Sequence, residues 1–250
     1  MDYPLIIIAA FCAGILNTIA GGGTFLTFPA LVFIGVPPVI ANATSAVAVF
    51  PGYLGGAFGF RNEIGSFDRK KLLKLTVVTL TGGFVGSLLL LVSSNQAFSF
   101  IVPFLLLFAT LAFLFGDRIR SWAEDQQRMI TPYGAFGLFC VSVYGGYFNG
   151  GLGIVFLALF ALWGMSDIHT MNGLKNGLSF ALSTISVAVF VIGGLVVWQP
   201  AIIMMIAATI GGYCGAPIAR ALPRHIIRWI IAGVGFSMSA IFLVRLLQQI

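Results

Sequence analysis

The stretch "IAGGGTFLTFP", residues 19–29, sets three glycines inside an apolar run long enough to cross a membrane. Glycine weakens a helix and takes backbone conformations that other residues avoid, so this run predicts a broken membrane helix. Unwound backbone is tolerated in a bilayer only where protein or a water-filled cavity surrounds it, because unpaired amides in lipid cost several kcal/mol each. We therefore expect the break to lie inside the protein.

The composition is that of an integral membrane protein. Apolar residues make up 59% of the 250 residues, charged residues only 8%, and the mean hydropathy is +1.05. Stretches of about 20 residues, the length that a helix needs to cross the hydrocarbon, carry no charge apart from Lys74 and Arg228; they are 4–20, 72–92, 98–115, 201–219 and 226–243. No alternating lipid-facing strands are visible, so the sequence predicts an all-α fold. The 13 Lys and Arg lie mostly in short connections, which indicates membrane orientation and no nucleic-acid partner.

The sequence repeats itself once. The segment that begins with the glycine run matches "NGGLGIVFLALFALWGMSDIHTMNGLKNG", which begins at Asn149. The aligned pairs, at a shift of 129 residues and then 130 after one insertion, are Gly21 with Gly150, Gly22 with Gly151, Gly35 with Gly164, Asn42 with Asn172 and Ser45 with Lys175. We predict two transmembrane repeats of about five helical segments each, over residues 1–116 and 132–250, joined by a solvated cytoplasmic linker over 117–131.

The basic clusters predict how the two repeats are oriented. They lie around residues 61–71, 118–128 and 220–228, and all three fall on the cytoplasmic side only if each glycine-interrupted region contributes an even number of crossings. Each repeat then crosses the membrane an odd number of times. The second repeat is therefore expected to be inverted, with both chain termini in the periplasm.

Even parity leaves two geometries for each glycine break. The arms after the breaks, residues 24–34 and 152–163, are roughly 16–18 Å long at 1.5 Å per residue, too short for about 30 Å of hydrocarbon. The arms before them, residues 4–20 and 132–148, are long enough to cross if nearly upright. Each break is either the tip of a re-entrant hairpin near the midplane or a joint between two full spans.

Short helices interrupted by glycine at matching positions of two halves point to a transporter's binding site. A helix that starts after each break leaves its first amides unpaired and favours an anion there. The polar patches "NATS" and "NGLKN" follow some 20 residues after the breaks. The candidate binding residues are Asn17, Gly22, Gly23, Thr24, Asn42, Thr44, Ser45, Asn149, Gly150, Gly151, Asn172, Lys175 and Asn176.

Each candidate also has a purely structural interpretation. The glycines would serve only to let helices pack closely, and Asn17 and Asn149 would only cap the turns. Lys175 is either a lysine that extends to the cytoplasmic interface or a fixed positive charge facing the internal site. We place Lys175 at or just inside a helix start, and Asp167 with His169 as a pair in the preceding loop.

No Asp or Glu lies deep in an expected span, which argues against a carboxylate proton relay and for selection of negative charge. A nucleotide-binding P-loop, a Ser/His/Asp constellation and metal-ligand spacing are absent from the sequence. We therefore expect neither enzymatic activity nor a cofactor or metal. A passive anion channel and a non-transporting membrane assembly subunit remain as alternatives, and a homo-oligomer is as open as a monomer.

The first half, "AGILNTIAGGGTFLTFPALVFIGVPPVIANATSAVAVFPGYLGG", resembles the TauE/SafE family, also called the sulfite exporter or TSUP family. The shared features are the glycine run, the following proline, the "G-x-P-P" turn and the "A-x-x-T-S" helix start. The resemblance implies a bacterial inner-membrane carrier of small sulfur-containing anions, with sulfite or sulfoacetate export as type activities. The second half departs from the family pattern at "NGLKN". We expect a secondary transporter that exports such an anion, sulfite first, or another small organic anion, by alternating access.

Overall fold

The computed structural model describes residues 2–20, 22–115, 118, 121–122, 133–221 and 224–247. Most of the predicted linker over 117–131 lies outside the described residues, as do the side chains of the basic cluster around 220–228. The described residues form helices and turns with no strand, which confirms the predicted all-α fold. The helices are α1 (Tyr3–Ala20), α2 (Thr24–Phe33), α3 (Pro38–Gly59), α4 (Arg61–Ser66), α5 (Arg69–Val92), α6 (Asn95–Leu114), α8 (Ala135–Tyr147), α9 (Leu152–Leu162), α10 (Ile168–Ile192), α11 (Trp198–Ala221) and α12 (Arg224–Leu247). Within the described part, Arg69–Val92, Asn95–Ala112 and His169–Ile192 are long and apolar enough to cross a membrane.

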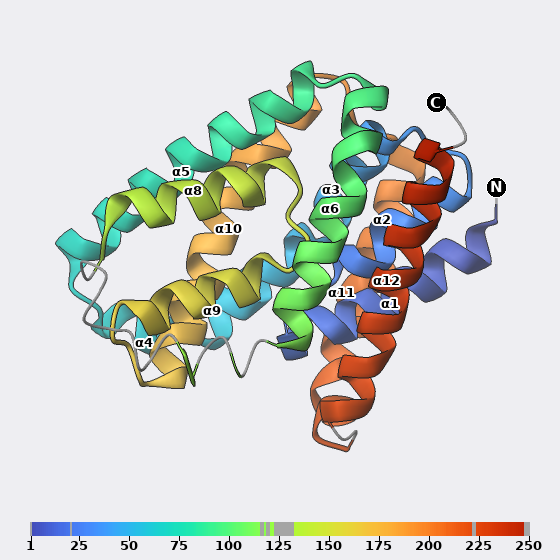
Figure 1. Cartoon of the computed structure of the whole chain (residues 1–250). Coiled ribbons are helices and arrows are strands. Elements are labelled where there is room, and N and C mark those ends of the chain that lie inside the picture. The colour runs from blue at the N-terminus through green and yellow to red at the C-terminus, as the bar shows by residue number, and fades with distance from the viewer. Residues whose placement is uncertain are drawn as a thin grey trace.

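New helices start after both glycine breaks, at the residues that the sequence indicated. Helix α2 has 10 residues and α9 has 11, about 15 and 16 Å at 1.5 Å per residue. Helix α8 has 13 residues, shorter than the arm over 132–148 that the sequence allowed. Helices α8 and α9 lie antiparallel, since Gly137 faces Leu159 and Gly145 faces Leu152 (Figure 1). The second break is therefore the tip of a short hairpin.

The two short helices end in the same way. Gly35 after α2 has φ 90° and Gly164 after α9 has φ 84°, a left-handed conformation that glycine takes without strain. The next residues close the helices identically: the Val36 amide donates to the Leu31 carbonyl, and the Met165 amide donates to the Phe160 carbonyl, both over 3.1 Å. This is the Schellman ending, and it explains why the sequence repeat places glycine at both positions.

The packing of the helices follows the sequence repeat. Helix α1 packs against α11 and α8 against α5; α3 packs against α11 and α10 against α5; α3 contacts α10, and α6 contacts α12. In the repeat, α1 corresponds to α8, α3 to α10, α5 to α11 and α6 to α12. Replacing each helix by its counterpart in the other half leaves this set of contacts unchanged. Phe50 of α3 and Phe180 of α10, which the repeat aligns at a shift of 130, stack with ring centroids 5.3 Å apart. The halves are thus paired as two copies of one unit around the contact between α3 and α10.

Glycines let the paired helices approach very closely. A Cβ added to Gly86 of α5 would lie 2.1 Å from the Val143 carbonyl oxygen of α8, and one added to Gly211 of α11 would lie 2.0 Å from the Phe11 carbonyl oxygen of α1. No real Cβ tolerates such distances, so backbone meets backbone at both contacts. Close packing through small residues holds membrane helices together where lipid offers no hydrophobic drive.

Two aspartates cap long helices at one end of the bundle. The Asp68 side chain accepts from the Lys70 and Lys71 amides at the start of α5, and Asp167 accepts from the His169 and Thr170 amides at the start of α10. The interpretation of Asp167 and His169 as a loop pair is therefore wrong: Asp167 is the N-cap and His169 lies in the first turn. Hydrogen bonds from Thr170 and from the His169 amide hold the pKa of the Asp167 carboxyl below its usual range.

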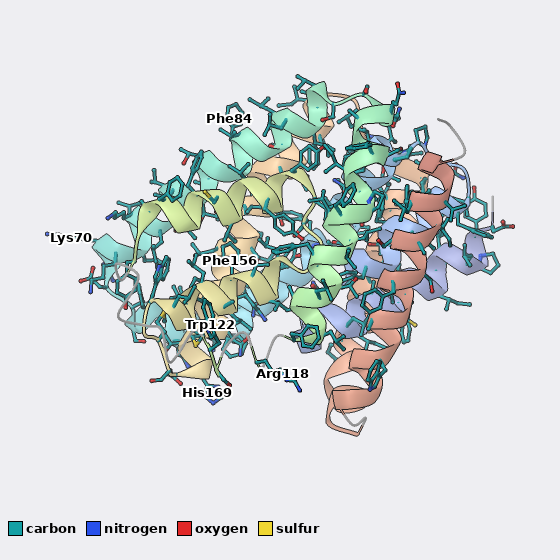
Figure 2. The ribbon with its side chains drawn as sticks, in the orientation of Figure 1. Lys70, Phe84, Arg118, Trp122, Phe156 and His169 are labelled. Atoms are coloured by element: carbon teal, nitrogen blue, oxygen red, sulfur yellow. The ribbon has the colours of Figure 1, made fainter. Side chains whose placement is uncertain are left out.

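Charged side chains and chain ends lie at opposite sides of the molecule. Lys70, Arg118 and His169 lie along the left and lower edges in Figure 2, and the end of α11 and the start of α12 lie at the bottom of the same view (Figure 1). The start of α1 and the end of α12 lie at the upper right (Figure 1). Phe84, which projects outward from α5 (Figure 2), belongs to the apolar flank between these two ends.

Candidate functional site

The second break is a tight turn built from two residues with positive φ. Asn149 has φ 63° and Gly151 has φ 68°, and Asn and Gly are the residues that adopt this conformation most readily. The Leu152 amide donates to the Asn149 carbonyl over 3.4 Å, and the Tyr144 hydroxyl donates to the Gly150 carbonyl. Two backbone carbonyls of the turn thus have hydrogen-bond donors that come from α8 and α9.

Helix α3 of the first half holds this turn from outside. The Asn42 side-chain amide donates to the Tyr147 carbonyl over 2.9 Å, and the Tyr53 hydroxyl donates to the Asn149 side-chain oxygen over 3.2 Å. Asn42, Tyr53 and Asn149 are all at least 95% buried. Asn149 lies in the turn with its side-chain oxygen accepting from Tyr53, and donation of its amide hydrogens to a ligand stays a prediction. The two bonds tie the second break to the other half of the molecule.

The first break needs glycine for close approach. Gly23 has φ −56°, which any residue adopts, but a Cβ there would lie 3.0 Å from the Ala13 carbonyl oxygen and 3.3 Å from Val49 Cγ1. Two properties of glycine were expected to matter at the breaks, a positive φ and the close approach of other groups. The first applies to Gly151 and the second to Gly23. Asn17 lies beside Gly23, and its side-chain oxygen is buried with no hydrogen-bond partner among the described residues.

At the start of α2, where an anion site was predicted, some of the backbone amides already donate to the protein itself. The Phe25 and Leu26 amides each donate over 3.1 Å to the carbonyls of Gly22 and Gly23, so these two donors are engaged within the first turn of α2. Thr27 and Ser45 share a hydrogen bond of 2.6 Å between buried hydroxyls, which joins α2 to α3. Any anion at this start is left with the amides that precede Phe25.

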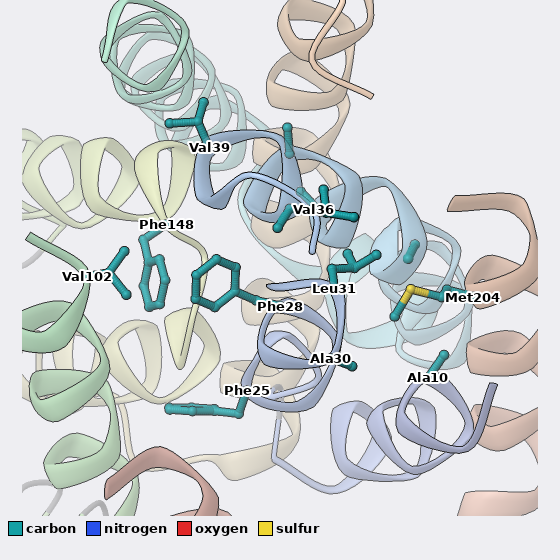
Figure 3. Packing of buried hydrophobic residues seen from close by; sticks show 14 of the residues in the cluster. Ala10, Phe25, Phe28, Ala30, Leu31, Val36, Val39, Val102, Phe148 and Met204 are labelled. Carbon is teal, nitrogen blue, oxygen red and sulfur yellow. The ribbon is translucent and has the colours of Figure 1, made fainter. Parts of the chain in front are cut away.

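The two breaks meet. A Cβ on Gly151 would lie 3.5 Å from Cε2 of Phe25 in the first turn of α2. One turn further on, Phe28 packs its ring edge to face with Phe148, with centroids 5.8 Å apart (Figure 3). Phe28 also stacks on Phe242 of α12 at the same centroid distance. Both short helices therefore start in one buried region, as the sequence predicted for breaks at matching positions.

Lys175 lies deeper than the sequence indicated. Helix α10 begins at Ile168, so Lys175 is two turns inside it, and only 5% of the side chain is exposed. The ammonium donates to the Asn172 side-chain oxygen over 3.0 Å. Lys175 is the only charged residue classed as buried in the part of the chain that the structure describes. Burying an unpaired charge is costly, so a buried lysine with a single neutral acceptor suits a site that takes an anion.

The other candidates lie at varied distances from the breaks. Gly22, Thr24 and Gly150 are buried at the breaks themselves, and Asn176 is half-buried beside Lys175 on α10. The Thr44 hydroxyl accepts from the Val197 amide just before α11, over 3.1 Å. Thr44 therefore joins two helices, while Ser45 beside it faces α2.

Sequence reasoning missed the side chains that hold the second break from α3 and α8. Tyr53 follows Asn42 by three helical turns, so the two lie on one face of α3, and this spacing was the available signal. Tyr144 lies in an apolar helix whose pattern does not indicate that its hydroxyl reaches Gly150.

Comparisons with known proteins match almost the whole chain. The family model described as "Sulfite exporter TauE/SafE" matches residues 6–242. A "Probable membrane transporter protein" of Haemophilus influenzae is 29% identical over 92% of this chain and 90% of its own length. The "Probable membrane transporter protein YfcA" of Escherichia coli K12 is 30% identical over 92% of this chain and 86% of its own. No solved structure matches.

Proposed function

The chain belongs to the sulfite exporter TauE/SafE family, and from this we propose that it is a secondary transporter that exports a small sulfur-containing anion, sulfite first, by alternating access. The family and the relatives named as probable membrane transporters make transport across a membrane the starting point. The observation that carries the proposal is the meeting of the two breaks, where Gly151 lies against Phe25. Two short helices that start in one buried region are suited to hold a ligand between the halves.

The charge of this interior favours an anion. Lys175 is a buried cation, and the described residues show no buried carboxylate to neutralise it. An ionisable group in a membrane helix is expensive and usually marks a ligand or ion pathway. A small oxyanion would pair with the ammonium and accept hydrogen bonds from helix-start amides and hydroxyls, and such charge-assisted bonds are stronger than neutral ones.

The shape of the hairpins supports a site near the midplane. Helices α8 and α9 are each too short to cross about 30 Å of hydrocarbon, and they turn back at residues 148–151. Each unwound turn is then enclosed by protein, as a bilayer requires. The exchange of contacts between the halves supports the inverted repeat, in which rocking one half against the other would expose the site alternately.

We assign the molecule to the bacterial inner membrane, with both termini in the periplasm. The assignment rests on the edge that carries Lys70, Arg118 and His169 (Figure 2), which lies away from the start of α1 and the end of α12 (Figure 1). Positive side chains collect on the cytoplasmic side. The predicted repeats over 1–116 and 132–250 agree with this orientation.

The test is efflux of radiolabelled sulfite from proteoliposomes that contain the purified protein. A transporter gives flux that saturates with sulfite concentration and is slowed by competing small anions. Flux that rises linearly without saturation would mean a channel. The absence of flux for sulfite, sulfoacetate and small carboxylates alike would contradict transport.

A further inference from the structure

Helix α10 carries a continuous polar face that the proposed site uses only at one end. Its members are spaced by three or four residues, so they fall within about 80° of the helix circumference and extend over about 21 Å. They are Asn172, Lys175, Ser179, Ser183 and Ser186. The three serines are 1%, 1% and 3% exposed, so the face is turned into the protein along its whole length.

The hydroxyls of these three serines are buried and have no hydrogen-bond partner in the described part of the chain. Four other helical hydroxyls behave differently: Ser87, Thr110, Ser142 and Thr184 each donate to the carbonyl four residues before them, over 2.6–2.8 Å. That back-bond is available to any serine in a helix. Among the described residues the one other buried hydroxyl without a partner is that of Thr79 in α5, a helix that packs against α10. A buried polar group left unpaired costs about 1–3 kcal/mol, so three on one face are better explained by a polar occupant than by dry packing.

The sequence repeat indicates what the face is turned towards. At a shift of 130, Asn172 corresponds to Asn42 and Ser183 corresponds to Tyr53. These two α3 residues donate to the second break, so the corresponding face of α3 is turned to the hairpin tip of the other half. By the same pairing, the polar face of α10 is turned to the interior where the breaks meet. The adjoining side of α10 is dry, since Phe180 stacks on Phe50 there.

We propose that Ser179, Ser183 and Ser186 line a hydrated passage along α10, which leads a small oxyanion between Lys175 and the hairpin tips. This inference rests on the proposed function and extends it from a site to a route. The serine hydroxyls donate to the oxygens of the anion in turn, and Lys175 attracts it at the cytoplasmic end. Weak neutral donors in series let an anion advance, whereas a second fixed charge would trap it.

The experiment is cysteine accessibility in membrane vesicles. Cys12, Cys140 and Cys214 are first replaced by alanine, and Ser179→Cys, Ser183→Cys and Ser186→Cys are then made singly. Thr184→Cys is the matched control, because Thr184 lies mid-helix about two and a half turns after Lys175, and therefore on the opposite side of α10. Thr184 is exposed, hence towards lipid. The probe is a small anionic methanethiosulfonate that does not cross membranes.

We expect at least two of the three serine-site cysteines to react about tenfold faster than Thr184→Cys, and added sulfite to slow the reaction. Reaction rates no faster than that of Thr184→Cys at all three positions would overturn the passage. Fast reaction without protection by sulfite would keep the passage and count against sulfite as the ligand, which separates this inference from the proposed function.

A second variant covers the case in which the cysteines disturb folding. In Ser179→Ala/Ser183→Ala/Ser186→Ala, each change removes one hydroxyl oxygen that has no hydrogen-bond partner in the described part of the chain. A hydrated passage predicts sulfite flux reduced about tenfold with an unchanged unfolding temperature. Unchanged flux with a raised unfolding temperature would mean that the face is dry.

Discussion

Replacing Tyr53 by phenylalanine tests whether the two halves of the molecule are latched at the second break. The change removes a single hydroxyl, which donates to the Asn149 side-chain oxygen over 3.2 Å. Tyr53 is 4% exposed and Asn149 is 5% exposed, so water does not replace the lost donor. Leaving a buried acceptor unpaired costs about 1–3 kcal/mol.

The expected result is a lower unfolding temperature in detergent. For a chain of this length, 1 kcal/mol corresponds to roughly 2–4 °C, so a loss of about 1–3 kcal/mol should lower the unfolding temperature of Tyr53→Phe by about 2–12 °C relative to the wild type. Tyr213→Phe is the control: Tyr213 is 88% exposed, and the same chemical change there should leave the unfolding temperature within about one degree.

A double-mutant cycle with Asn149→Ala then isolates the pair, since residues in contact show non-additive effects. In the Asn149→Ala background, Tyr53→Phe should lower the unfolding temperature much less than in the wild type. Equal unfolding temperatures for Tyr53→Phe and the wild type, or fully additive effects in the cycle, would refute the latch.

Two further predictions concern the scaffold around the site. Gly86→Ala should destabilise the protein by about 1–3 kcal/mol through overpacking, because its Cβ would lie 2.1 Å from the Val143 carbonyl oxygen. The control Gly55→Ala should be neutral or slightly stabilising, because a Cβ on Gly55 would have no atom within 4 Å. Equal unfolding temperatures for the two variants would contradict the close contact of α5 with α8. Asp167→Asn should lower the unfolding temperature at pH 7, and the difference should shrink as the pH falls below the carboxyl's usual pKa of 3.8. The pKa of the Asp167 carboxyl is lower in the folded protein than its usual value. The ionised cap therefore stabilises the fold above about pH 3.8, and this stabilisation is lost as the carboxylate takes up a proton at lower pH. A difference in unfolding temperature between Asp167→Asn and the wild type that does not change with pH would contradict this role of the cap.

The sequence predicted the parts of this molecule that follow from local chemistry. Three glycines in an apolar run indicate a break, and counting residues to the next turn gives arms too short to cross, so the starts at Thr24 and Leu152 were predicted correctly. The repeat also aligned Gly35 with Gly164, which the structure explains by identical helix ends. Asp68 and Asp167 were missed as caps, although an aspartate just before an apolar helix is a recognised signal.

Contacts between distant segments were beyond what residue patterns indicate. The bonds from Asn42 to the Tyr147 carbonyl and from Tyr53 to Asn149 join residues about 100 positions apart, and no periodicity specifies them. The depth of Lys175 was misjudged for a related reason, since the start of α10 depends on the Asp167 cap. Once that cap is recognised, Lys175 falls two turns inside the helix and is buried.

The central claim is that the buried ammonium of Lys175 draws an anion into the region where the two breaks meet. Its most direct test is saturable sulfite efflux from proteoliposomes for Lys175→Met, with Lys74→Met as the matched control, because Lys74 is an exposed lysine within α5. Methionine fills nearly the same volume without the charge, so both variants should fold, which their unfolding temperatures check. We predict that efflux falls at least about tenfold, equivalent to 1.4 kcal/mol, in Lys175→Met and is unchanged in Lys74→Met. Efflux in Lys175→Met equal to that of the wild type would contradict the claim.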